Sequence, residues 1–210
     1  MRRLHVVLIV LTTLAIAFGG VASAEESLTY PITGTQHGKT LKQFVTEYGK
    51  WSVRNDGVKG CSIAQPAAPI VFLPSVATKG KSSFTCSFPA GSKILVLGGF
   101  NMCWTDPKTT RADLPKQCAP SSLKVVTKLK TTVDGMPLDT RRFLVSSSMF
   151  TANLPAKNTY GVKAGPTTFL MTGWFPLLRP LAPGKHVING VMSIKDYGTF
   201  DVTYNVTITN

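Results

Sequence analysis

Histidines and acidic residues are scarce in this chain of 210 residues, which has 3 histidines and 10 aspartates and glutamates. Acid–base catalysis needs such groups close together, with a partner that orients the base. Only His37 and His186 lie beyond the N-terminal segment, and no G-x-S-x-G nucleophile motif occurs. A carboxylate pair of the glycosidase type stays open, because two scattered acids can meet in the fold. The sequence therefore predicts no catalytic residue and favours a non-enzymatic protein.

The chain also lacks the pattern of a zinc site, since its cysteines form no C-x-x-C pair and have no histidine nearby. No metal or cofactor is expected. An even number of cysteines in an exported chain indicates two disulfides, for which three pairings are possible. We favour Cys61–Cys86 and Cys103–Cys118. The second bond would close a loop rich in turn-forming residues and stabilise the fold by roughly 3 kcal/mol.

A phosphate-binding loop is missing as well, although GTQHGKT (34–40) resembles one. Only three residues separate Gly34 from Gly38, whereas the motif needs four, so nucleotide binding is not expected. Thr40 and Gln43 instead have the spacing of a helix capping box. An apolar helical face follows, formed by Leu41, Phe44, Val45, Tyr48 and Trp51. We predict one short amphipathic helix here, preceded by a flexible lead-in over residues 25–39.

Long apolar runs are absent except at the N-terminus, where Val6–Phe18 follows Arg2 and Arg3 and precedes Ala22-Ser23-Ala24. This order is that of a secretory signal peptide, and the run is shorter than the about 20 residues that a membrane span needs. We expect residues 1–24 to be removed and the protein to be secreted or periplasmic. The remaining 186 residues (210 minus 24) suit a single disulfide-bonded domain over residues 40–210.

Most of that domain has the pattern of strands separated by Gly/Pro turns. The clearest is residues 199–209, where apolar and polar residues alternate strictly, as in an antiparallel sheet with one dry and one wet face. Asp134-Gly135 predicts a tight hairpin between 123–133 and a return strand at 141–150. The other expected strands are 69–75, 83–88, 93–99 (buried on both faces), 167–181 and 186–194. We predict an all-β, antiparallel β-sandwich or jelly-roll-like domain.

Several stretches resemble, in the same order, a group of uncharacterised exported bacterial β-rich proteins with a C-x-[IV]-P-A-G-K … L-x-P-G-K-H pattern. They are Cys61-Ser-Ile-Ala-Gln, Val71-Phe-Leu-Pro, Cys86-Ser-Phe-Pro-Ala-Gly-Ser-Lys, Val133-Asp-Gly, Phe150 with Leu154-Pro155, Gly173-Trp174 and Leu181-Ala-Pro-Gly-Lys-His. This chain departs from the pattern by Ser92, inserted before Lys93, and by Gly-Gly-Phe-Asn in place of a longer apolar run. The group has no established activity, so the resemblance implies the fold and export alone.

Positive charge is the strongest sign of a partner. The net charge is +13, and +11 without Arg2 and Arg3 (13 minus 2). Such a field attracts anionic partners, for example an anionic envelope polymer, an acidic glycan or an anionic lipid surface. The expected patch lies on the wet face of 123–133 and extends across the hairpin: Lys124, Lys128, Lys130, Arg141 and Arg142. The alternative is that these charges only keep the sheet soluble and discourage edge pairing.

Among the tryptophans, Trp51 and Trp174 are expected in the core, whereas Trp104 follows Cys103 in a polar stretch and is a candidate for stacking on a sugar. Asn205-Val206-Thr207 is a glycosylation sequon, relevant only in a eukaryotic source. The leading hypothesis is a non-enzymatic exported protein that binds an anionic polymer or a carbohydrate. The alternatives are an envelope- or polysaccharide-directed hydrolase with a carboxylate pair or His186 as its acid/base, and a structural or protein-interaction module.

Overall fold

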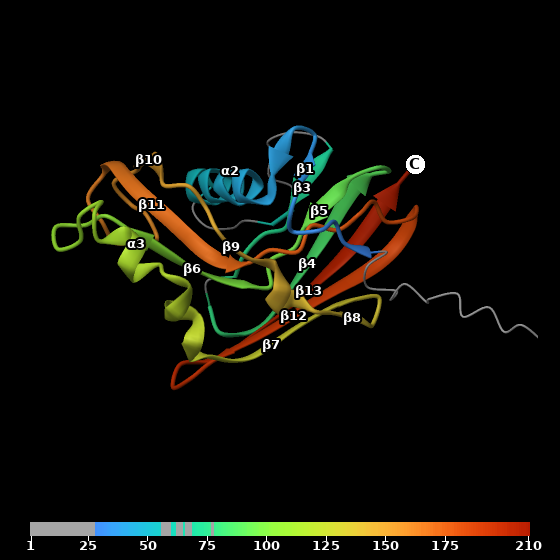
Figure 1. Ribbon diagram of the computed structural model, residues 1–210. Helices are drawn as coiled ribbons and strands as arrows, with labels where there is room; N and C mark the ends of the chain where they lie inside the picture. The colour runs from blue at the N-terminus through green and yellow to red at the C-terminus, as the bar shows by residue number, and fades with distance from the viewer. Residues whose placement is uncertain (1–27, 56–59, 62–64, 66–68, 77) are drawn as a thin grey trace, which may run out of the picture.

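The computed structural model describes residues 28–55, 60–61, 65, 69–76 and 78–210. The predicted signal peptide, residues 1–24, lies outside these residues. Strands dominate the described chain (Figure 1), which confirms a β-rich fold. The strands are β1 (Thr35–Gln36), β2 (Lys39–Thr40), β3 (Ile70–Phe72), β4 (Gly80–Pro89), β5 (Lys93–Leu95), β6 (Gly99–Trp104), β7 (Val126–Val133), β8 (Met136–Leu138), β9 (Leu144–Ser146), β10 (Phe150–Leu154), β11 (Gly165–Trp174), β12 (Gly184–Ile194) and β13 (Gly198–Thr209). The helical elements are α2 (Leu41–Arg54), α3 (Leu114–Gln117) and the 3-10 segments η1 (Pro120–Val125) and η2 (Thr140–Phe143).

The largest sheet has five strands in the order β4-β13-β12-β7-β8. Its neighbours β13, β12, β7 and β8 pair antiparallel, but β4 runs parallel to β13 over ten residue pairs. A second parallel pair joins β3 to β5. The expectation of a purely antiparallel fold is therefore wrong in these two places. Alternation along a strand tells which face is buried, but it does not tell in which direction the neighbouring strand runs.

A second layer of strands faces the large sheet. In it β11 pairs with β6 on one side and with β9 and β10 on the other. The bonds from Val96 N to Pro176 O and from Leu178 N to Ile94 O, both 2.9 Å, join the chain after β11 to β5. The small β3–β5 pair thus continues this layer. Helix α2 contacts β9, β10 and β11. It lies at the top of Figure 1, with β7 and β12 at the bottom.

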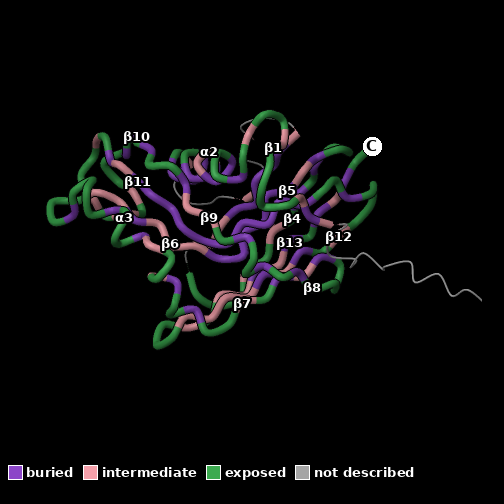
Figure 2. Tube along the Cα trace, in the orientation of Figure 1, coloured by how far each residue is buried: buried purple, intermediate pink, exposed green. Residues whose placement is uncertain are grey.

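The β3–β5 pair is buried on both faces, as predicted for the apolar run at 93–99. Ile70 and Phe72 belong to the core beneath α2, whereas Val71 and Leu73 belong to the core against the large sheet. The same alternation divides residues 94–97 between the two cores. Buried residues accordingly gather in the centre of the molecule and exposed ones outside it (Figure 2). This short pair is the shared wall of two cores.

Helix α2 begins as its capping box predicts. Thr40 Oγ1 accepts from Gln43 N at 3.4 Å, and Gln43 Oε1 accepts from Thr40 N at 2.7 Å. The predicted apolar face is buried against β10 and β11. The stretch before it, expected as a flexible lead-in, has defined structure from residue 28 onward. Strands β1 and β2 form a hairpin whose turn residues His37 and Gly38 have φ of 50° and 74°.

Both ends of the predicted 123–133 hairpin differ from expectation. Residues 120–125 form η1, so β7 starts at Val126, and a bulge opposite Ser193/Ile194 shifts the alternation near its start. Asp134 and Gly135 do have positive φ, 51° and 81°. The return strand, however, is the short β8, and residues 141–150 pass through η2 to the second layer. The prediction of a return strand at 141–150 is therefore wrong.

Two disulfides join the pairs favoured from the sequence, Cys61–Cys86 and Cys103–Cys118. Their Cα atoms are 5.1 and 5.9 Å apart, within the ordinary range for such bonds. Such bonds are typical of oxidising compartments outside the cytosol. The described residues include no helix that is long and apolar enough to cross a membrane.

Candidate functional site

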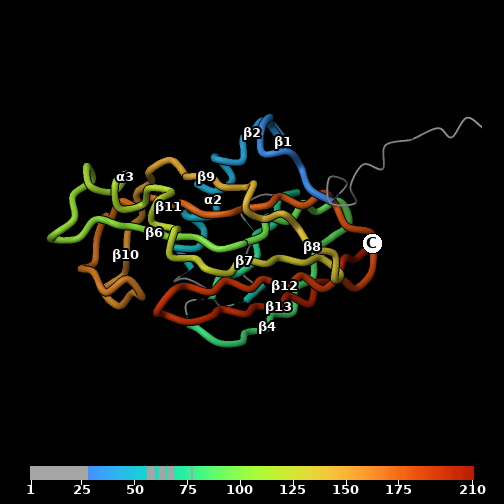
Figure 3. Tube along the Cα trace, turned by 60° about the horizontal axis from the view of Figure 1, so that its bottom comes forward, coloured from blue at the N-terminus to red at the C-terminus, as the bar shows by residue number. Residues whose placement is uncertain are grey.

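The outer face of the five-stranded sheet, which points away from the second layer, is polar and carries lysines from three strands. Lys128 and Lys130 come from β7, Lys81 from β4 and Lys185 from β12, and all four are exposed. Register places Lys130 and Lys81 on one line across the sheet, since Lys130 lies opposite Val191, Val191 opposite Asp201, and Asp201 opposite Lys81. Lys185 lies opposite Thr207, about 20 Å further along β12, toward the other end of the same face. Figure 3 shows these strands side by side along one side of the molecule. We call this surface the lysine face.

Between the lysines the face presents short polar side chains, and these bond to one another. Asn189 Nδ2 donates to Asp201 Oδ1 at 3.0 Å and to Thr203 Oγ1 at 3.2 Å. Ser193 and Thr199 are joined by a hydroxyl bond of 2.9 Å. The sequon residue Asn205 also lies on this face and donates to Ser83 Oγ at 3.2 Å. The lysine face is therefore a polar array whose hydroxyls and amides are joined by hydrogen bonds, with a hollow beside Lys81 and Asp201.

The lysines themselves are not neutralised. Among the described residues, no carboxylate forms a salt bridge with Lys81, Lys128, Lys130 or Lys185. The acid nearest to them in the register is Asp201, which lies opposite Lys81 on the neighbouring strand and accepts a hydrogen bond from Asn189. Four lysines and one aspartate leave this face with an excess of positive charge, which attracts anions over about 8–10 Å at ordinary ionic strength.

The structure divides the predicted basic patch. Lys128 and Lys130 lie together on the lysine face, and Lys124 is exposed in the adjoining η1. Arg141 and Arg142 lie in η2, which contacts both β7 and β11, and not on a return strand of the hairpin; Arg141 Nη2 donates to Val126 O, at the start of β7, at 3.5 Å. The Arg141 guanidinium lies 5.4 Å from the centre of the Trp174 ring, and Arg142 donates to Thr29 Oγ1 at 3.0 Å. Sequence reasoning missed Lys81 and Lys185, which reach this face only through the pairing of β4 and β12 with β13.

Trp104 is not in an exposed loop but ends β6, in the second layer, where it is half-buried. Its ring contacts Tyr160 edge to face at 5.2 Å, and Tyr160 in turn contacts Phe169. Trp51 and Trp174 are buried, as predicted. Trp104 therefore belongs to an aromatic cluster on another layer and adds no stacking surface to the lysine face.

His186, the histidine of the hydrolase alternative, has both ring nitrogens engaged. Nδ1 lies 2.7 Å from Asp134 Oδ2, and Nε2 lies 2.8 Å from Ala182 O. Burial lowers the pKa of His186, but the hydrogen bonds to Asp134 and Ala182 outweigh it and raise this pKa above its ordinary value. A ring that donates from both nitrogens is a poor base. The bond between His186 and Asp134 instead connects the β7–β8 turn to the start of β12.

Other acid–base or metal chemistry finds little support in the part of the chain that the structure describes. No three His, Cys, Asp or Glu side chains gather there in a way that could hold a metal ion. Asp196 lies in the turn between β12 and β13, whereas Asp201 lies on the lysine face. Asp196 sits in the turn with a φ of 59°, which suits a turn residue.

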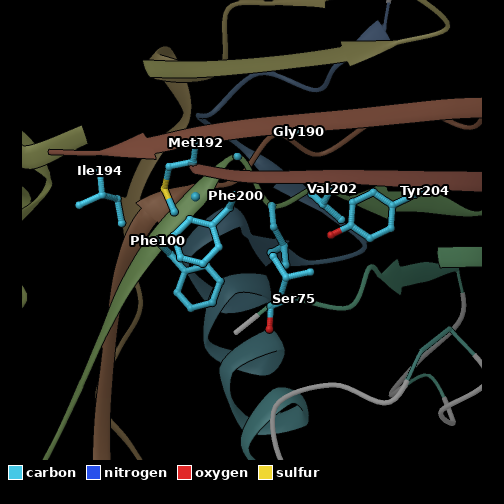
Figure 4. A pocket seen from close by; sticks show the side chains of 12 residues that line it. Ser75, Phe100, Gly190, Met192, Ile194, Phe200, Val202 and Tyr204 are labelled. Atoms are coloured by element: carbon cyan, nitrogen blue, oxygen red, sulfur yellow. The ribbon is translucent and has the colours of Figure 1, made fainter. Parts of the chain in front are cut away.

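The opposite, inner face of the same sheet contains an apolar pocket of about 190 Å³ near the middle of β12 and β13. Gly98, which precedes β6, and Gly99, its first residue, lie in the wall of the pocket. Gly190 of β12 lies there as well (Figure 4). Sequence reasoning missed this pocket. The one available signal was Gly190 within an apolar strand, a position where glycine often permits a close approach.

Comparison with protein-family models, with curated proteins and with solved structures found no match for this chain. The likeness to the group of exported bacterial proteins therefore stays a prediction from the sequence motifs.

Proposed function

We propose that this protein is an exported β-sandwich protein that binds acidic polymers on its lysine face. The observation that supports it most is that one face of the sheet presents four exposed lysines from three strands, none of them in a salt bridge with a carboxylate of the described residues. The net charge of +11 after removal of residues 1–24 (13 minus 2) acts in the same direction.

The spacing of the lysines favours an extended anion over a compact one. Lys128 and Lys130 are two residues apart on one strand, which is about 7 Å. Three strand spacings separate Lys130 from Lys81, about 14 Å at 4.8 Å each. No two of these side chains converge on one point, and lysine acts as a single flexible charge without the fixed fork of arginine. A chain with repeated negative charges can meet several of them at once.

A second candidate, a protein-interaction module, is favoured by one observation. Strand β4 forms an edge of the large sheet in the described part of the chain, and its ten residues make a long edge. Edge strands of this length can pair with a strand of another chain. Lys81 near its start opposes such pairing, so polymer binding remains the function that we propose.

The test measures binding of the oxidised mature protein to dextran sulfate, with uncharged dextran beside it, at low and high salt. We expect binding to dextran sulfate alone, falling steeply as salt rises. The double variant Lys128→Glu/Lys130→Glu should weaken binding by about tenfold or more, a change of about 1.4 kcal/mol.

The matched control is Lys50→Glu/Lys157→Glu, which changes the net charge equally at exposed positions on α2 and on the β10–β11 connection. If both double variants lose binding equally, net charge and not the lysine face is responsible. Absence of binding at low salt would overturn the proposal and leave the interaction module.

A further inference from the structure

The pocket on the inner face of the large sheet is lined mainly by apolar side chains. Its walls come from the turn of the chain between β5 and β6 and from the facing strands β12 and β13, with Ser75 and Val76 at one side. Figure 4 shows Met192, Phe100 and Phe200 together at one part of the wall and Tyr204 at another. The apolar side chains that shape it are Leu97, Phe100, Met192, Ile194, Phe200 and Val202.

Glycine makes room for the pocket at a position where the backbone does not require it. Gly190 lies inside β12, and a Cβ placed there would meet nothing closer than Val202 Cγ1 at 3.4 Å. Glycine inside a strand is unfavourable, because it lacks a side chain to pack and loses more backbone freedom. Gly99 differs, since its φ is 146° and a Cβ would collide with Met192 Sδ. At Gly190 the missing side chain mainly leaves volume.

The pocket is open to solvent, although its lining is apolar. Phe100, Met192, Ile194 and Phe200 around it are half-buried, not buried. Apolar walls that remain in contact with water lose the stabilisation that full burial would give, about 25 cal/mol per Å². Concave apolar surfaces of this kind are characteristic of small-molecule sites.

The polar groups of the lining limit the class of ligand. Among the described residues, the polar side chains of the lining are the hydroxyls of Ser75 and Tyr204, and none of its side chains is charged. The Tyr204 hydroxyl already donates to Pro74 O at 2.5 Å. A carboxylate or ammonium would leave water here without a counter-charge, which is costly. The lining therefore suits an uncharged ligand.

We propose that this pocket binds a small uncharged apolar molecule, of the size of one aromatic ring or a short alkyl chain. Its volume of about 190 Å³ sets the limit, since an apolar cavity of about 150 Å³ holds one benzene. The site lies on the face of the sheet opposite to the lysine face, so it is independent of polymer binding.

The test uses methionine methyl signals of the oxidised protein, labelled with ¹³C, during titration with indole and, separately, with benzoate. Indole is an uncharged ring compound and benzoate is a charged ring of comparable size. We expect indole to shift the Met192 methyl signal in a saturable way and benzoate to leave it unchanged. Met149, which is exposed, and Met171, which is buried elsewhere, are internal controls that should not move.

Gly190→Val should abolish the indole shift, because its methyl groups occupy the pocket from a strand position that suits a β-branched residue. Val191→Ile adds bulk on the outer face of the same strand and should keep the shift. If Gly190→Val does not fold, the methyl titration of the unaltered protein decides. No saturable shift of Met192, equal shifts of all three methyls, or an equal response to benzoate would each overturn the proposal.

Discussion

The two faces of the five-stranded sheet come from the same strands and meet opposite surroundings. Along β13, Val202, Tyr204 and Val206 are buried against the second layer, while Thr203 and Asn205 between them belong to the lysine face. One strand thus contributes to a dry core and to a charged surface through its period of two alone. The pattern along a strand assigns each residue to a face, whereas the neighbours across the sheet decide which side chains that face presents together.

The inner face also varies along its own length. Around Ile188 and Tyr204 it is closed, with both side chains at most 1% exposed. At the next inward-facing pair, Gly190 lies opposite Val202, and the apolar pocket begins there. The inner face therefore changes from closed to open along β12, beginning at Gly190, which has no side chain to fill the space.

The greatest loss of stability is expected from truncating a side chain on the inner face, compared with its neighbour on the outer face. Ile188→Ala removes a fully buried side chain from the inner face and should lower the free energy of unfolding by about 3 kcal/mol. Val187→Ala, its neighbour on the outer face and 44% exposed, should change it by less than about 0.5 kcal/mol. Urea denaturation of both variants measures the contrast. Equal losses would mean that the outer face is covered in solution.

A smaller effect is expected from a buried hydroxyl. Tyr204→Phe removes the bond to Pro74 O and leaves this carbonyl without that donor, at a cost of about 1–2 kcal/mol in the free energy of unfolding. Burial also raises the pKa of Tyr204 above its ordinary value, so the hydroxyl stays protonated as a donor. Thr203→Val on the outer face is the control and should remain within about 0.5 kcal/mol.

The smallest effect concerns His186, at the end of the inner row. Because its pKa is raised in the folded state above 6.5, its contribution to stability is fully present below that value. This contribution declines as the pH rises from 6.5 through the raised pKa. His186→Gln and Asp134→Asn should both remove this decline in urea midpoints measured across that range. A decline of the same size in both variants would assign it to other groups.

Local chemistry made part of the fold predictable. The Thr40/Gln43 capping box, the turn at Asp134-Gly135 and the alternation of residues 199–209 each involve residues close in the chain, and all three are found. The favoured disulfide pairs are found as well. The predicted return strand at 141–150 does not form. The three residues of β8 complete the hairpin instead, and Arg141 and Arg142 lie in the 3-10 segment η2 that follows.

Half of the lysine face was predictable for the same reason. Lys128 and Lys130 share a face because they are two residues apart on one strand, whereas Lys81 and Lys185 join them through pairing between distant strands. The sequence pattern of residues 80–89 does not predict that β4 runs parallel to β13. Likewise, a glycine inside a strand does not tell whether the space it leaves is filled from the opposite layer.

The charge, the strand periodicity and the start of the helix follow from the sequence, because they depend on composition or on neighbours within a few residues. The parallel pairing of β4, the placement of lysines from three strands on one face and the apolar pocket beside Gly190 follow from the tertiary structure. These depend on which strands, far apart in the chain, lie side by side. This arrangement of strands buries the two apolar cores on either side of the β3–β5 pair.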